Sequence, residues 1–272
     1  MLKENSDKVD SIIKLENVSF YYPESTEPVF ENLSIELGPG ISSLIGQNGT
    51  GKSTFLLLAG GTVLPQLGDV SILGQNTKEL REVVKRHELV SFVFQNMEFD
   101  SDESIGDLLE YVFQNGFLKD VKPDFVRELV KIFELEKCLG RKTQEVSKGE
   151  LQRTILAFSL LYGSRILMMD EPIFALENYQ KEKAMDYLCH YSREHGIHLF
   201  FSLHELELTE KYAENILLFY KNDKLEYGPK ADVFDKSKIE EAYQVPYFML
   251  KQKEALFREQ LEVQYDSDKS ES

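Results

Sequence analysis

A lysine and a serine follow three glycines in the stretch GQNGTGKST, which spans residues 46–54. The stretch fits the pattern G-x-x-x-x-G-K-[ST] and lies between an apolar run, ISSLI, and a helix-like run, FLLLA. A loop that wraps a phosphate must turn backbone N–H groups inward at distances that side chains would obstruct, and glycine permits this. The following helix aims its positive N-terminus at the anion. The pattern therefore predicts a nucleotide phosphate site.

The residues of this loop have separate expected roles. Lys52 would reach the β- and γ-phosphates of a nucleoside triphosphate, and Ser53 would bind Mg²⁺ through its hydroxyl. The alternative is an ordinary turn before a helix, which the flanking strand and helix disfavour. The remaining residues expected to contact the nucleotide are Gly46, Gln47, Asn48, Gly49, Thr50, Gly51 and Thr54.

Two adjacent acids end the apolar run ILMMDE at residues 166–171. A buried strand would deliver Asp170 to the C-terminal edge of a parallel sheet, where the ligands of doubly wound folds bind. Asp170 is therefore a candidate for holding Mg²⁺, and Glu171 is a candidate for polarising an attacking water. Strands often end in acids, so the pair alone is a weak signal. Together with the glycine-rich loop it becomes a more specific indication of a nucleotide site.

Alternating strand and helix patterns surround these residues. Alternating apolar residues at 11–20 and 31–37 predict strands, as do the runs GDVSILG at 68–74 and ELVSFVFQ at 88–95. Apolar residues at 98–146 follow a helical period instead, which predicts a helical insertion. After it, helix-like and strand-like segments alternate again. This order is typical of a mostly parallel sheet covered by helices on both faces.

The order of these motifs resembles the ATP-binding subunits of ABC transporters over residues 12–235. In this resemblance VSFYYP carries the aromatic residue that stacks on adenine, Tyr22. VFQN carries the glutamine that senses Mg²⁺ or water and faces the membrane partner, Gln95. The segment VSKGELQR resembles the family signature, and FFSLHE supplies the switch histidine, His204. Each companion motif has an ordinary structural explanation on its own, so their joint order carries the resemblance.

The resemblance implies an α/β fold, that of a P-loop NTPase of the RecA type. A mostly parallel sheet core would carry an N-terminal antiparallel β-subdomain and an inserted α-helical subdomain at about 98–160. The cassette would span residues 1–235, and residues 236–272 would form a short C-terminal extension. Its acidic end, QYDSDKSES, is expected to be disordered.

The resemblance also implies a mechanism. In the family, ATP binds between two subunits, and the signature of one subunit faces the glycine-rich loop of the other. Ser147 and Gly149 would then contact the γ-phosphate at the start of a helix whose dipole favours an anion. Hydrolysis of ATP to ADP and phosphate would depend on Mg²⁺. The catalytic residues would be Glu171, His204 and Gln95, and the residues that hold Mg²⁺ would be Ser53, Gln95 and Asp170.

Three residues depart from the usual motifs of the family. Lys148 occupies the first glycine position of the usual signature LSGGQ, and Glu150 replaces its glutamine. Glu177 stands where the D-loop, here FALE, usually has aspartate. Because the serine and the second glycine of the signature remain, we expect hydrolysis to be retained and at most slowed.

Composition limits the kinds of partner. The 272 residues include 47 acidic and 31 basic side chains, and the net charge of −16 disfavours nucleic acid as a partner. No apolar run is long enough for a membrane span, and the N-terminus lacks the pattern of a signal peptide. Cys138 and Cys189 are too few for a disulfide framework. We therefore expect a cytoplasmic protein, and the resemblance implies that it is peripheral on the inner face of the cell membrane through a permease.

The resemblance implies two kinds of partner: integral membrane permease subunits and a second ATPase subunit, in a homodimer or a heterodimer. A solute-binding protein is a further candidate. The segment KSKIEEAYQVPYF resembles the C-terminal end of iron-chelate and metal importer ATPases, whereas SKG resembles some exporters, so the direction of transport stays open. Two other functions stay open: a cytosolic ABC ATPase that acts on ribosomes or DNA, and a nucleotide-dependent regulator with little hydrolysis. The single cassette and the negative charge argue against the first, and the altered signature motivates the second.

Overall fold

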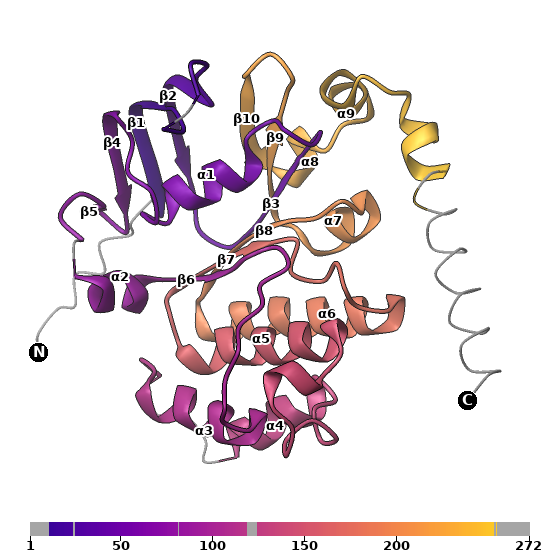
Figure 1. Ribbon diagram of the computed structural model, residues 1–272. Coiled ribbons are helices and arrows are strands. Elements are labelled where there is room, and N and C mark those ends of the chain that lie inside the picture. Colours follow the sequence, from indigo (N-terminus) through magenta and orange to yellow (C-terminus); the bar gives the residue numbers. More distant parts are fainter. Residues whose placement is uncertain (1–10, 24, 81, 119–123, 253, 255–272) are drawn as a thin grey trace, which may run out of the picture.

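Two β-sheets and the helices that cover them form the chain, and the computed structural model describes residues 11–252 and Glu254, apart from residues 24, 81 and 119–123 (Figure 1). The first sheet is antiparallel, with the strand order β2-β1-β4-β5. This sheet is the N-terminal antiparallel subdomain that the sequence predicts. Its strands are β1 (Ile13–Phe20), β2 (Phe30–Leu37), β4 (Leu67–Ile72) and β5 (Gln75–Asn76).

The second sheet has the strand order β10-β9-β3-β8-β7-β6. Neighbours from β9 to β6 pair in parallel, and the edge strand β10 pairs antiparallel to β9. Every residue of β3 is buried, as expected for a central strand covered on both faces. The predicted mostly parallel core is therefore confirmed. Its strands are β3 (Ile41–Gly46), β6 (Val90–Val93), β7 (Ile166–Asp170), β8 (His198–Ser202), β9 (Asn215–Phe219) and β10 (Leu225–Pro229).

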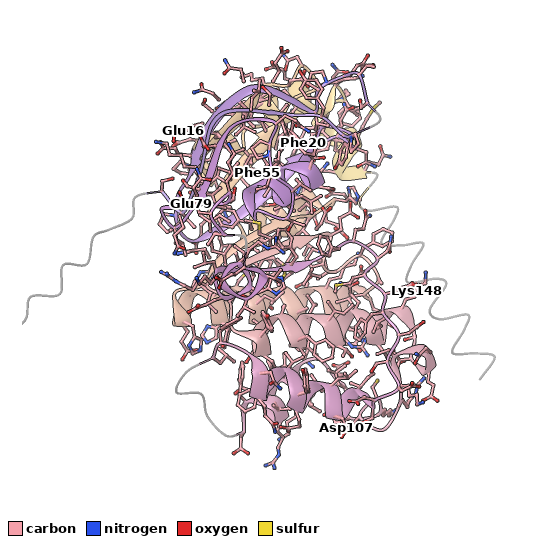
Figure 2. All side chains as sticks on the ribbon, turned by 60° about the vertical axis from the view of Figure 1, so that its left-hand side comes forward. Glu16, Phe20, Phe55, Glu79, Asp107 and Lys148 are labelled. Carbon is pink, nitrogen blue, oxygen red and sulfur yellow. The ribbon has the colours of Figure 1, made fainter. Side chains whose placement is uncertain are left out.

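Helix α1 (Lys52–Ala59) lies between the two sheets. Phe55 is 1% exposed and packs in one apolar cluster with Leu15 of the antiparallel sheet and Phe200 of the parallel sheet. Figure 2 shows Phe55 beneath the antiparallel strands that carry Phe20. A helix enclosed in this way must be apolar nearly all round, which explains the run FLLLA.

The other face of the parallel sheet is covered by α5 (Lys148–Tyr162), α6 (Asn178–His195) and α7 (Leu206–Tyr212). Two further helices, α3 (Ile105–Asn115) and α4 (Phe125–Ile132), pack on this layer and lie farther from the sheet (Figure 1). They lie in the helical insertion expected from the change of period at residues 98–146, and both contact α5.

One predicted strand begins later than the sequence indicates. Residues 88 and 89 of ELVSFVFQ belong to α2 (Val83–Leu89), and β6 begins at Val90. Only Val90 to Val93 pair with β7, whereas the carbonyl of Glu88 accepts the N–H of Arg165 at 3.3 Å. The apolar run alone could not show at which residue pairing with β7 begins.

The chain after the parallel sheet folds back onto it. Short helix α8 (Lys230–Val233) precedes α9 (Lys236–Tyr243), which the Asp235 side chain caps by accepting two backbone N–H groups. Within the described residues, no helix has both the length and the apolar composition needed to cross a bilayer. Residues 255–272, which include the end predicted to be disordered, lie outside the described residues.

Candidate functional site

The glycine-rich loop joins the end of β3 to the start of α1, as the sequence predicts. The backbone angle φ is positive at Gly46, Gly49 and Gly51, at 150°, 80° and 92°. A Cβ atom on Gly46 would lie 2.7 Å from the carbonyl oxygen of Phe219, and one on Gly51 would lie 2.8 Å from Cζ of Phe30. Glycine is therefore required at Gly46 and Gly51 by close packing as well as by backbone conformation.

The side chain of Lys52 lies inside this loop. Its Nζ atom donates hydrogen bonds to the carbonyl oxygens of Gly46 and Gln47, each at 2.8 Å. Burial lowers the pKa of Lys52 below its ordinary value, and the carboxylates of Asp170 and Glu171 oppose that shift. A bound triphosphate would favour the charged ammonium in the same way, by adding negative charge nearby.

The predicted acids Asp170 and Glu171 share a hydrogen-bonding partner on the neighbouring strand. Ser202, opposite Asp170 in the β7–β8 register, donates its hydroxyl to Oδ1 of Asp170 at 2.5 Å. The same hydroxyl oxygen accepts the backbone N–H of Glu171 at 3.0 Å. Glu171 has φ of 51°, in the left-handed region that residues with side chains seldom adopt. Ser202 therefore supports the backbone conformation that aims the Glu171 side chain.

The carboxylate of Glu171 lies between the other two predicted catalytic side chains. Its Oε2 atom accepts a hydrogen bond from the Gln95 amide at 2.7 Å, and its Oε1 atom is 2.6 Å from Nε2 of His204. The Glu171 side chain is 11% exposed, whereas that of His204 is 42% exposed. The three residues follow the neighbouring strands β6, β7 and β8, so the parallel sheet brings their side chains together at its C-terminal edge.

The residues predicted to hold Mg²⁺ offer oxygen donors of the kind that this ion prefers. They supply the exposed hydroxyl of Ser53, the carboxylate of Asp170 and the amide oxygen of Gln95. Across the described part of the chain, no group of three or more His, Cys, Asp or Glu residues is arranged to hold a metal ion. The three oxygen donors named above fit a Mg²⁺ ion whose remaining ligands are phosphate oxygens and water.

Tyr22 lies beside the first turn of α1. Its hydroxyl is 3.0 Å from Oγ1 of Thr54, and its ring makes an edge contact with Phe20 at 5.1 Å between centroids. The side chain is 42% exposed, which leaves a face of the ring available for stacking on a base.

The signature residues begin α5, and one departure from the usual signature has a local explanation. The Oγ atom of Ser147 accepts the backbone N–H of Glu150 at 3.2 Å, and the Glu150 carboxylate accepts the N–H of Ser147 at 2.7 Å. This reciprocal pair is a capping box. Arg141 lies 3.3 Å from the Glu150 carboxylate. Lys148, whose side chain is 81% exposed and 3.4 Å from that of Glu98, points away from the chain in Figure 2.

The signature also contacts the D-loop of the same chain. A Cβ atom on Gly149 would lie 3.0 Å from the carbonyl oxygen of Ala175, and the side-chain amide of Gln152 donates to the carbonyl of Pro172 at 2.7 Å. Glu177, the other departure, is the N-cap residue of α6. The second glycine of the signature is therefore needed where two segments approach closely.

The predicted residues of the loop and of the strand ends lie close together. The carboxylates of Asp170 and Glu171 act on the Lys52 ammonium, and Gln47 and His204 line one cavity. The chain therefore brings together the loop, the two acids and the Gln95 and His204 side chains that contact Glu171.

Two contacts in this region involve residues that the sequence did not single out. Ser202 precedes His204 in FFSLHE, but its position opposite Asp170 depends on which strands are neighbours. Lys181 and Glu205 form an ion pair at 2.5 Å, with the Lys181 side chain 5% exposed. Sequence spacing could not pair these residues. The available signal was that Lys181 is a charged residue on the face of α6 that is buried.

Comparisons with known proteins agree with this geometry. Residues 30–174, more than half of the chain, match the family model described as ABC transporter. A putative ABC transporter ATP-binding protein of Pyrococcus furiosus is 28% identical over 226 residues, which are 82% of this chain and 85% of that protein. The energy-coupling factor transporter ATP-binding protein EcfA1 of Mycoplasmopsis synoviae is 29% identical over 237 residues, 84% of this chain and 86% of that protein.

A solved structure shows the same architecture. The dimeric structure of a bacterial ABC transporter cassette has a TM-score of 0.69 and 25% identity, and the match covers 80% of this chain and 98% of that one. The predicted fold class is confirmed by this likeness and by the family match. The chain therefore belongs to the ABC transporter family, as one of its ATP-binding subunits and an ATPase of the P-loop class.

Proposed function

We propose that this chain binds Mg-ATP between two cassettes and hydrolyses it to energise solute transport by a separate membrane permease. The observation that carries the proposal is the Glu171 carboxylate, which lies between Gln95 at 2.7 Å and His204 at 2.6 Å. It stands at the edge of the sheet that also presents the glycine-rich loop. Each of these residues follows a strand of the parallel sheet.

Glu171 is the proposed general base. A water in line with the γ-phosphate would give its proton to this carboxylate as the water oxygen attacks phosphorus, and the bond from phosphorus to the bridging oxygen would break to release ADP. His204, which contacts the carboxylate oxygen that Gln95 does not, would hold the water and the γ-phosphate in position. Lys52 would offset the charge that develops on the phosphate oxygens. These roles require Glu171 to point into the site, which its left-handed backbone and its hydrogen bond to Ser202 favour.

We propose that Ser53, Asp170 and Gln95 hold Mg²⁺, because they present oxygen donors beside the loop. When bound, the ion would neutralise charge on the β- and γ-phosphates. The Asp170 carboxylate is turned toward the site by its hydrogen bond with Ser202, so the protein orients this donor in advance. Tyr22 would stack on the adenine at the far end of the nucleotide.

A second cassette is needed to complete the site in this proposal. Ser147 and Gly149 would reach the γ-phosphate bound by a partner, in a homodimer or a heterodimer. The Glu150 departure supports retained hydrolysis, because its carboxylate takes part in the cap of α5 and leaves the signature helix intact.

Permease subunits are the proposed membrane partner, and a solute-binding protein is a further one. Phe94, next to Gln95, is 39% exposed and stacks on Phe92 at 5.3 Å between ring centroids. An apolar side chain at the surface beside a site residue supports docking of another protein there. Through this contact the chain would be peripheral on the inner face of the cell membrane.

The substitution Glu171→Gln tests the function. It keeps the shape and the hydrogen bond acceptor but removes the basic carboxylate, so we expect ATP binding and dimer formation to persist while kcat falls by about 100-fold or more. Phosphate release is measured with Mg²⁺ and with the metal removed by EDTA, and dimerisation by light scattering.

Ordinary phosphate release by the Glu171→Gln protein would refute the role of this residue. A wild-type protein that binds ATP and dimerises without releasing phosphate would instead favour the nucleotide-dependent regulator. A membrane protein that co-purifies with the chain would identify the permease.

A further inference from the structure

The C-terminal segment reaches back to the glycine-rich loop. Helix α9 packs on β3 and β9, with Ile239 and Ala242 fully buried. At its end the hydroxyl of Tyr243 accepts a hydrogen bond from the backbone N–H of Gly46 at 3.0 Å. The side-chain amide of Gln47 donates to the carbonyl oxygen of the same tyrosine. One residue that is distant in sequence therefore binds the first two residues of the loop.

The same segment also contacts the start of α7. The carboxylate of Glu254 accepts the backbone N–H of Leu206 at 2.6 Å, two residues after His204. Between these contacts lies a cavity of about 590 Å³, and its lining includes Gln47, His204 and Tyr243. Tyr243 and Glu254 thus contact the two stretches of chain that would face the γ-phosphate.

The contact at Gly46 restrains a position that has no free space. The residue is buried, and a Cβ atom there would lie 2.7 Å from the carbonyl oxygen of Phe219 and 3.3 Å from Oγ1 of Thr50. Without the Tyr243 hydroxyl the Gly46 N–H would lose this partner, and a buried donor that lacks a partner is unfavourable. Burial raises the pKa of Tyr243 above its ordinary value, so the hydroxyl stays protonated near neutral pH.

We propose that Tyr243 is a positioning residue for the nucleotide site, which anchors the start of the glycine-rich loop so that its amides are ordered before ATP arrives. A loop ordered in advance binds more tightly, because the ligand does not have to supply the free energy of ordering it. The inference rests on the proposed function, since the ligand of this loop is the triphosphate. It assigns to the C-terminal extension a part in nucleotide affinity.

The chain offers a matched control for removing the Tyr243 hydroxyl. Tyr227 of β10 accepts the backbone N–H of Gly38 at 3.1 Å, a contact of the same kind before β3 begins, at the end of that strand opposite Gly46. Tyr243→Phe and Tyr227→Phe each remove a tyrosine hydroxyl that accepts a glycine N–H. Only the first removes it from the nucleotide loop.

The experiment measures the dissociation constant for ATP of the full chain by titration calorimetry, with a thermal melt of each variant. We expect about five- to tenfold weaker binding for Tyr243→Phe. Without the hydrogen bond the loop is less ordered, and ATP binding must then supply part of the free energy of ordering it. Tyr227→Phe is expected to bind ATP within about twofold of the wild type, even if its melting temperature falls equally. Binding by Tyr243→Phe within twofold of the wild type would overturn the proposal.

Hydrogen exchange of residues 41–56 gives a second readout that does not depend on ATP. In Tyr243→Phe these amides are expected to exchange faster than in Tyr227→Phe, and unchanged exchange would contradict the anchoring role. If the wild type itself fails to bind ATP, the proposed function fails, and the exchange data still decide whether Tyr243 orders the loop. If Tyr243→Phe does not fold, hydrogen exchange of the Gly46 N–H is measured in the wild type instead. Fast exchange of that amide would overturn the proposal.

Discussion

Substituting Ser202 by alanine tests how far hydrolysis depends on the backbone of Glu171. The change removes the hydroxyl that donates to Asp170 at 2.5 Å and accepts the Glu171 N–H at 3.0 Å. A hydrogen bond to a charged group contributes about 1.5–3 kcal/mol and one to a neutral amide about 0.5–1.5 kcal/mol. The two bonds together stabilise the local structure by about 2–4.5 kcal/mol.

Only part of this free energy affects catalysis. The left-handed conformation of Glu171 is unfavourable by about 1–2 kcal/mol, and the hydrogen bond from its N–H to Ser202 helps to offset that strain. If Glu171 relaxes by this amount, the carboxylate is correctly aimed in a smaller share of molecules, and kcat falls by about 5- to 30-fold. The KM for Mg-ATP is expected to rise as well, because the same hydroxyl orients the Asp170 carboxylate that would hold Mg²⁺.

The assay is steady-state phosphate release over a range of ATP concentrations, together with urea unfolding. Ser159→Ala is the matched control, since the Ser159 hydroxyl is also buried and donates to the carbonyl of Leu156 at 2.7 Å within α5. We expect the control to lose stability and to keep its kcat. An unchanged kcat in Ser202→Ala, or an equal loss of kcat in both proteins, would refute the reasoning.

Two other predictions follow from the packing. Gly51→Ala places a Cβ atom 2.8 Å from Cζ of Phe30 at φ of 92°, so the free energy of unfolding should fall by about 2–4 kcal/mol with loss of ATP binding. Gly74→Ala, at φ of 78° with open space around it, should cost about 1 kcal/mol, and equal losses in urea unfolding would contradict this account. Burial lowers the pKa of His198 in the folded chain below its ordinary value of 6.5. As the pH falls, the histidine is therefore protonated first in the unfolded chain, and the free energy of unfolding should decrease from about pH 6.5 down to the pKa of the folded state. His198→Gln should weaken this pH dependence in urea unfolding at pH 7.5 and 5.5, and an identical dependence would argue against it.

The parts of the fold that sequence could predict are those set by neighbouring residues. The glycine-rich loop was recognisable because glycine, lysine and serine must follow one another closely to wrap a phosphate. The parallel core followed from alternating strands and helices. The beginning of β6 was wrong by two residues, because Leu89 and Val90 are both apolar and only pairing with β7 separates them.

The contacts that sequence could not predict join residues far apart in the chain. Gly46 and Tyr243 are separated by 197 positions, and Glu171 and Ser202 by 31. Tyrosine and serine are ordinary residues in their own segments, so their types carry no signal. Glu150 appeared as a departure from a motif, and only the capping box at the start of α5 shows what its carboxylate does.

Helix α1 has a consequence that extends beyond its position between the sheets. It touches the antiparallel strands on one side and the parallel strands on the other, and the Tyr22 hydroxyl meets its first turn at Thr54. A helix clamped on both sides cannot shift toward one sheet without pushing on the other, because close-packed interiors transmit displacement. Any movement that a nucleotide imposes on the start of α1 is therefore transmitted to both sheets at once. The contact between Thr54 and Tyr22 carries the same movement to the residue proposed to stack on the adenine.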